Sequence, residues 1–165
     1  MYFFARIEET GFSIWLRESD WGFFTALTFH SLALATVVGI NLAINLRVLG
    51  FAHRVPINLM NRFLPVMGIG LVVVVISGIL LLIAYPAKAL TNVVFYLKIA
   101  AIIAALLITQ HFNKTLMQPS NQGIAEIDSK QKKLAVAALV LWIISISAGR
   151  FLAYTHSVLL ASRFY

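Results

Sequence analysis

The stretch Trp21–Arg47, WGFFTALTFHSLALATVVGINLAINLR, decides the fold of this chain. Between its two end residues it contains no acid, and His30 is its one ionisable group. An apolar run of this length is long enough to cross a bilayer as one helix. At about 1.5 Å per residue, His30 is expected roughly 13 Å below Trp21, in the outer third of a hydrocarbon core about 30 Å thick. An ionisable side chain at this depth is costly and marks a candidate functional site that needs a partner.

The composition of the whole chain is that of a membrane protein. Of its 165 residues, 61% are hydrophobic and 12% are charged, and the mean hydropathy is +0.90. Soluble domains contain about 45–50% apolar residues, so we expect an integral membrane protein that contacts lipid. The net charge of +7 comes from basic residues at the ends of apolar runs, which orient helices in a membrane and do not form a nucleic-acid surface. The absence of cysteine excludes disulfides and thiolate metal sites.

Four apolar segments predict an all-α, integral membrane four-helix bundle in a single domain, 1–165. The predicted spans are residues 21–47, 63–85, 93–112 and 134–156. Residues 1–20 mix apolar and charged side chains, which predicts a short interfacial helical segment on the membrane surface. The connectors after the first and third spans are basic, so the positive-inside rule places them in the cytoplasm and both termini outside.

Small residues repeat every four positions along the first span. These residues are Ser31, Ala35, Gly39 and Ala43. Such a seam lets helices approach closely. It predicts close packing either within the bundle or between protomers of a homo-oligomer.

Three basic residues on three different spans are expected in one layer of the membrane. His30 lies roughly 13 Å, Lys98 roughly 9 Å and Arg150 about 5 Å below the outer surface if each helix rises about 1.5 Å per residue. Cationic groups so close together repel in a low dielectric unless something anionic or electron-accepting lies between them. No span contains an acid that would serve.

A haem would meet these requirements, because it supplies iron for a neutral imidazole and propionates for an arginine. We therefore consider His30 an axial ligand and Arg150 a propionate partner. Lys98 is a candidate second metal ligand because burial favours its neutral amine, with a water or an open position as the alternative. His156, expected at the outer interface, would hydrogen-bond a propionate or ligate the iron from above.

Each of these residues also has a purely structural explanation. A lone histidine inside a membrane can serve as a hydrogen-bonding packing residue, and Lys98 and Arg150 can extend toward the outer interface. His53 and His111 are expected to be interfacial and solvated, although a second haem between them is an alternative. His111 lies too far from His30 to share an iron with it.

The residues that carry a family resemblance extend from the first span to the fourth. They are His30, NLRVLG at Asn45–Gly50, Pro65, Ser77–Gly78, Asn92, Phe95, Lys98, Trp142 and Gly149–Arg150. This pattern resembles an uncharacterised family of small bacterial four-helix membrane proteins. A first-span histidine with a third-span lysine is more distantly similar to the small haem-b membrane proteins that include the oxygen-independent protoporphyrinogen oxidase. That resemblance implies haem b at His30 with Lys98 near it.

We therefore expect a multi-pass, b-type cytochrome of a bacterial inner membrane. It would carry electrons between a quinone or a periplasmic partner and another redox protein. One alternative is a haem-dependent membrane oxidoreductase acting on a quinone or porphyrin, which needs an apolar pocket beside His30 that opens to lipid. The other is a cofactor-free accessory subunit or small transporter, in which Lys98 and Arg150 would bind an anion. Whether the protein is an enzyme stays open.

Overall fold

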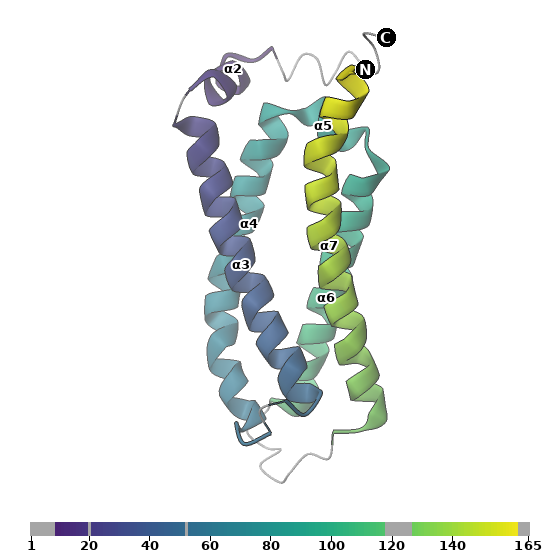
Figure 1. Cartoon of the computed structure of the whole chain (residues 1–165). Helices are drawn as coiled ribbons and strands as arrows, with labels where there is room; N and C mark the ends of the chain where they lie inside the picture. Colours follow the sequence, from purple (N-terminus) through teal and green to yellow (C-terminus); the bar gives the residue numbers. More distant parts are fainter. Residues whose placement is uncertain (1–8, 20, 52, 118–126, 162–165) are drawn as a thin grey trace.

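Four long helices build the protein in a computed structural model, which describes residues 9–19, 21–51, 53–117 and 127–161 (Figure 1). The long helices are α3 (Gly22–Val48), α4 (Leu64–Ala84), α6 (Val93–Leu116) and α7 (Ser129–Ala161). Three shorter elements are α2 (Gly11–Glu18), the 3₁₀ helix η1 (Ile57–Phe63) and α5 (Pro86–Leu90). Within the described residues there is no strand, and the predicted all-α class is confirmed.

Within the part of the chain that the structure describes, four helical regions are long and apolar enough to cross a membrane. They are Gly22–Val48, Ile57–Ala84, Val93–Leu116 and Ser129–Leu152. The short helix α2 precedes them, with Phe12 and Trp15 exposed on one side and Arg17 and Glu18 near its end. The predicted architecture, a four-span membrane bundle with a short N-terminal helix, is therefore confirmed in its fold.

The third and fourth spans are longer than the apolar runs alone predicted. Helix α6 continues to Leu116, and α7 begins at Ser129, so that it includes the lysines at the end of the connector. The start of α7 is fixed by a reciprocal cap, because Asp128 Oδ1 accepts from the Ser129 amide at 2.6 Å and Gln131 Oε1 accepts from the Asp128 amide at 3.0 Å. Such a cap satisfies amides that a helix start leaves unpaired, and it extends the helix beyond the hydrophobic segment.

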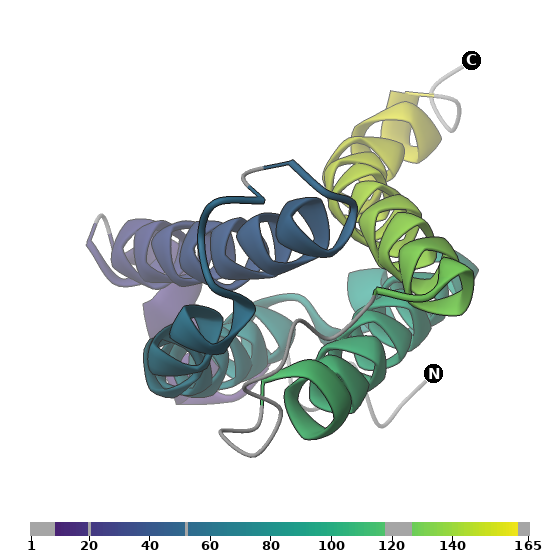
Figure 2. The same ribbon diagram turned by 90° about the horizontal axis from the view of Figure 1, so that it is seen from below.

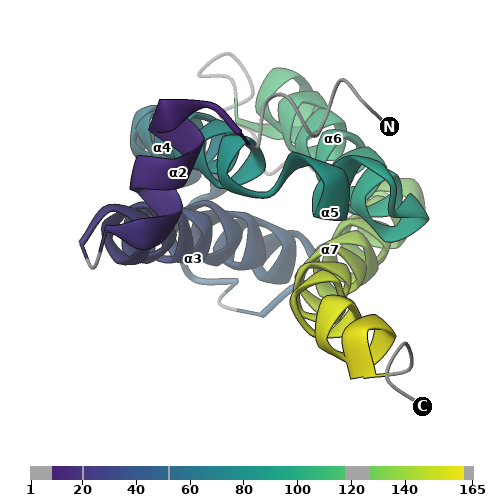
Figure 3. The same cartoon turned by 90° about the horizontal axis from the view of Figure 1, so that it is seen from above.

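The long helices pack as two antiparallel pairs. Helix α3 packs along α4, α6 packs along α7, and α3 also contacts α7. Helix α3 approaches α4 closely at Gly70, where a Cβ atom would be 3.1 Å from Cγ2 of Val37 and 3.5 Å from the carbonyl oxygen of Ala33. Figures 1 and 3 show that the two pairs diverge toward the end of the bundle that carries α2 and α5.

The apolar core lies in the other half of the bundle. One buried cluster consists of Ile44, Val48, Phe112, Leu116, Met117 and Ala135, and η1 covers it through Ile57 and Met60. A second cluster, midway along the helices, consists of Val37, Ala105 and Trp142. Figure 2 shows the end of the bundle where η1 lies beside α3 and α4. Apolar packing therefore joins the two helix pairs at this end and at the middle.

The small-residue seam does not pack within the described bundle. Ser31, Ala35, Gly39 and Ala43 are all exposed on α3, and a Cβ atom at Gly39 would have no neighbour within 4 Å. The close contact of α3 with α4 uses Ala33 and Val37 instead, because these residues lie on the opposite side of the helix. The prediction that the small-residue seam packs within the bundle is therefore wrong.

We predict that replacing Gly70 destabilises the α3–α4 pair. A leucine side chain at this position would have to displace Val37, so Gly70→Leu lowers the free energy of unfolding by about 1–3 kcal/mol relative to Gly68→Leu. Gly68 is the matched control on the same helix, since a Cβ atom there meets nothing within 4 Å. Unfolding by SDS, titrated into the detergent-solubilised protein, measures both variants. Equal stability of the two would contradict the close approach at Gly70.

Candidate functional site

His30 lies half-buried between α3 and α4, where its ring is held by a serine. Its Nδ1 atom is 2.9 Å from Oγ of Ser77, and that hydroxyl lies 2.6 Å from the carbonyl oxygen of Val73. A hydroxyl has one proton, and the carbonyl can only accept, so the Ser77 proton points to Val73. The Ser77 oxygen then accepts from Nδ1–H of His30. In the neutral form of the ring, this network leaves the lone pair on Nε2.

A glycine allows the imidazole to pack closely on α4. A Cβ atom at Gly78 would lie 3.4 Å from Cε1 and 3.8 Å from Nδ1 of His30. The adjacent residues Ser77 and Gly78 therefore act together, since one holds the ring by a hydrogen bond and the other leaves space for it.

Lys98 has a similar place in the second helix pair. Its side chain extends from α6 across Gly149 of α7, where a Cβ atom would lie 3.5 Å from Nζ and 3.7 Å from Cε. Lys98 is half-buried. Each pair of helices thus contributes one basic side chain that packs over a glycine of its neighbour.

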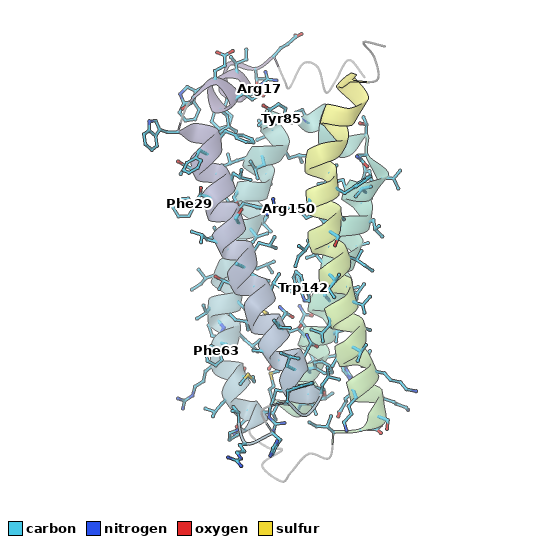
Figure 4. The ribbon with its side chains drawn as sticks, in the orientation of Figure 1. Arg17, Phe29, Phe63, Tyr85, Trp142 and Arg150 are labelled. Atoms are coloured by element: carbon cyan, nitrogen blue, oxygen red, sulfur yellow. The ribbon has the colours of Figure 1, made fainter. Side chains whose placement is uncertain are left out.

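Arg150 follows Gly149 directly and is exposed on the protein surface. In the view of Figure 4 it lies between the ribbons of α3 and α7. All six acidic residues of the chain lie outside the four spans, so no span offers a carboxylate to Lys98 or Arg150. A permanent cation within an apolar span requires an anion or access to water.

The packing around these basic residues differs from that of the rest of the bundle. Neither apolar cluster of the described chain includes a residue of α3 before Leu34, of α6 before Ile102 or of α7 after Trp142. His30, Lys98 and Arg150 all lie beyond these limits. The two helix pairs are therefore not joined by a buried apolar cluster at the level of the basic residues.

Two of the other histidines, His53 and His111, do not join this site. His53 and His111 are exposed, and the ring of His111 packs against Phe112 with centroids 6.2 Å apart. The side chain of His156 lies outside the described residues. Among the residues that the structure describes, no three His, Cys, Asp or Glu side chains converge. A metal at His30 would therefore need most of its ligands from a macrocycle or from solvent.

A separate polar network crosses the middle of the bundle. Asn41 of α3 accepts a hydrogen bond from Oγ1 of Thr109 of α6, and its amide donates to the Val37 carbonyl at 2.9 Å and to Sδ of Met67 at 3.2 Å. Asn45 donates to the carbonyl of Asn41 at 2.7 Å. Asn41, Asn45 and Thr109 are fully buried, so this network is structural and links the two helix pairs.

Two buried polar atoms close to this network have no partner within the described chain. They are Oδ1 of Asn45 and Nε1 of Trp142, which Figure 4 places midway along α7. An unpaired buried donor or acceptor is costly unless water or a ligand satisfies it. Apart from this nitrogen, Trp142 packs against the apolar residues Val37 and Ala105.

An apolar groove of about 510 Å³ has Ser77 among its lining residues. It is open to the side and is formed by α2, α3 and α4. The groove is lined by Phe12, Trp15, Leu16, Ser19, Trp21, Gly22, Thr25, Ala26, Phe29, Val73, Ile76, Ser77 and Leu80. Ser77, which also holds His30, is the residue that the groove and the imidazole site share.

The fold and the site define a class of protein. It is a four-span membrane protein with a histidine and two further basic side chains at one end of the bundle, where the spans offer no acid. Within that class, the chain belongs to a family of unknown function, DUF6644, whose match covers residues 3–155. This assignment agrees with the predicted membership of an uncharacterised four-helix family. No curated protein and no solved structure matches the chain, so the distant resemblance to haem-b proteins stays an expectation.

We predict that Thr109→Val weakens the link between the helix pairs. Valine keeps the shape of threonine but removes the donor to Asn41, leaving a buried carbonyl oxygen without that hydrogen bond. Side-chain hydrogen bonds between membrane helices contribute about 0.5–1.7 kcal/mol, and we expect a loss of stability in this range. The control is Thr36→Val, whose exposed hydroxyl donates only to the Leu32 carbonyl of its own helix. Equal SDS unfolding of both variants would refute the link.

Proposed function

We propose that this protein is a b-type haem protein of a bacterial inner membrane and that Nε2 of His30 is an axial ligand of the iron. The observation that carries the proposal is the hydrogen-bond network of the imidazole. Nδ1 donates to Ser77, whose proton is directed to Val73, so the lone pair of the ring is on Nε2. Metal-binding histidines typically donate their second ring nitrogen in this way, which fixes the tautomer and the ring orientation.

The two other basic residues supply what a haem requires beside its iron. Arg150 and Lys98 lie on the second helix pair, opposite His30, and no acid of the spans neutralises them. Haem propionates would provide the missing negative charges, with Arg150 suited to a bidentate contact. Lys98 serves either as a second propionate partner or, as its neutral amine, as the sixth iron ligand. The missing apolar cluster at this level supports a prosthetic group between the helix pairs.

A haem bound in this way supplies reversible one-electron chemistry. The chain's own part is to hold the ring of His30 in one tautomer, to balance the propionate charges and to exclude water from the iron. The protein would then carry electrons between a quinone or a periplasmic partner and another redox protein.

A second candidate function is a haem-dependent membrane oxidoreductase acting on a quinone or porphyrin. The observation that favours it is the apolar groove beside Ser77, which opens to the side and has the volume of a small-molecule site. The two candidates share the haem and differ in whether a substrate reacts in the protein. A third, cofactor-free candidate is an accessory subunit or small transporter in which Lys98 and Arg150 bind an anion.

We predict that the protein purified in detergent shows haem Soret and alpha bands in an oxidised-minus-reduced spectrum. These bands disappear in His30→Ala, because the variant lacks the proposed axial ligand. His111→Ala is the control and keeps the bands, since His111 is exposed and lies at the other end of α6. A shift of the bands in Lys98→Ala would identify lysine as the sixth ligand.

A colourless wild-type protein, expressed with sufficient haem, would overturn the haem proposal. Bands that persist unchanged in His30→Ala would overturn the assignment of the ligand. In the first case, binding of inorganic anions that depends on both Lys98 and Arg150 would support the cofactor-free candidate.

We also predict that Ser77→Ala weakens haem binding while leaving the protein folded. Loss of the partner of a metal-binding histidine typically lowers affinity about 10–100-fold. Competition with apomyoglobin measures the haem affinity, and Ser31→Ala, an exposed serine of α3, is the control. Equal haem affinity of the two variants would show that the contact with Ser77 does not serve a metal ligand.

A further inference from the structure

The end of the bundle opposite the candidate site carries many exposed basic side chains. They lie on the connector between α3 and α4, at the end of α6 and at the start of α7. We call this set the basic end, and it consists of Arg54, Arg62, Lys114, Lys130, Lys132 and Lys133. The elements that carry these side chains pack around the apolar cluster of Ile44 and Phe112, and Figure 2 views the bundle from this end. The exposed cations are therefore gathered at one surface of the membrane.

The described part of the chain places one acid, Asp128, at this end. Its carboxylate accepts from the Ser129 amide and so caps α7. Lysines 130, 132 and 133 follow directly, and the first turn of α7 contains no acid. The N-terminus of a helix has a partial positive charge, so lysines there are repelled by the helix and by one another. An anion from outside the chain would offset this repulsion.

The connector between α3 and α4 is tied back to the end of α3. Gly50, with a φ of +99°, allows the chain to turn there, and its amide donates to the Arg47 carbonyl at 3.2 Å. The next amide, that of Phe51, donates to the Leu46 carbonyl at 3.0 Å. The guanidinium of Arg47 donates to the Val55 carbonyl, which fixes the connector against the helix.

Exposed apolar side chains lie close in sequence to the two arginines of this connector. At such a helix end the residue after the glycine commonly packs on the helix, but Phe51 is 66% exposed. Phe63 is 49% exposed and follows Arg62 directly, and Figure 4 places it at this end of the bundle. Exposed aromatic side chains beside exposed cations are typical of a segment at the boundary between headgroups and acyl chains.

We propose that the basic end binds the headgroups of anionic phospholipids. Arginine and lysine donate to the phosphate oxygens, and the net negative charge of the headgroup offsets the excess of cations. A zwitterionic headgroup has the same phosphate, but its own cation cancels that charge. An acidic protein segment would bring the charge without the acyl chains that cover Phe51 and Phe63. The proposal goes beyond the haem site, with which the basic end shares no residue.

The experiment is a titration of the detergent-solubilised protein with phosphatidylglycerol and, separately, with phosphatidylcholine of the same acyl chains. Native mass spectrometry measures the bound lipid. We expect phosphatidylglycerol to bind at least about fivefold more tightly, since one Lys or Arg near an anionic headgroup contributes about 1 kcal/mol. Arg54→Gln with Arg62→Gln, and Lys132→Gln with Lys133→Gln, each raise the Kd of phosphatidylglycerol by about this factor. Raising the ionic strength from about 0.1 M to about 1 M shortens the screening length from about 10 Å to about 3 Å and removes the preference.

Two further variants separate charge from structure and from position. Arg54→Lys with Arg62→Lys keeps both charges and is expected to keep the preference. Arg17→Gln with Lys88→Gln removes the same charge from α2 and α5 at the other end, and leaves the Kd unchanged. Equal binding of the two lipids by the wild-type protein, or an equal loss in this control, would refute the proposal. Binding of polyglutamate through the same cations, without a preference for phosphatidylglycerol, would assign the surface to an acidic protein segment instead.

Discussion

The hydrogen bond between His30 and Ser77 is the interaction on which the candidate site depends. In a span without acids, a histidine needs a partner for one ring nitrogen, and Ser77 provides it while giving its own proton to the Val73 carbonyl. The direction of this chain of bonds sets the tautomer, because a backbone carbonyl has no proton to give. The geometry thus leaves Nε2 as the one basic atom of the imidazole.

The two ends of the bundle are built differently, and the difference has a physical cause. Toward η1 and the start of α7, large apolar side chains such as Ile44 and Phe112 fill the space between the helix pairs. Toward α2 and α5, the inward positions carry His30 and Lys98, each over a glycine of its neighbouring helix. Basic side chains cannot replace an apolar core, because their charges repel and must be solvated or neutralised. The lack of a buried apolar cluster at this end, together with the presence of His30 and Lys98, therefore indicates a site there.

Hydrophobic length and composition were sufficient to predict the class and the four spans, since a membrane imposes both. The spans' ends were less predictable, because polar caps such as Asp128 with Gln131 extend helices beyond their apolar runs. For the site, residue counting placed His30 and Lys98 near each other, yet it gave no sign that Ser77 holds the ring. The position of a residue along its own helix does not specify which side chain of another helix that residue contacts. The small-residue seam shows the same limit, since its repeat is evident in the sequence but the side it faces is not.

The polar network at the middle of the bundle determines how the two helix pairs can respond to a ligand. Asn41 and Thr109 join α3 to α6 by a fully buried bond, and the apolar clusters fix everything between this bond and η1. Beyond it, His30 is bound to its own pair and Lys98 packs on its own pair, and neither of these contacts crosses between the pairs. At this end the two pairs are also joined by α5, which connects α4 to α6 and contacts both, so the spacing of His30 and Lys98 depends on α5 as well as on the Asn41–Thr109 link. A group that binds both His30 and Lys98 would bridge the two helix pairs at this end of the bundle. It would connect two side chains that do not contact each other directly.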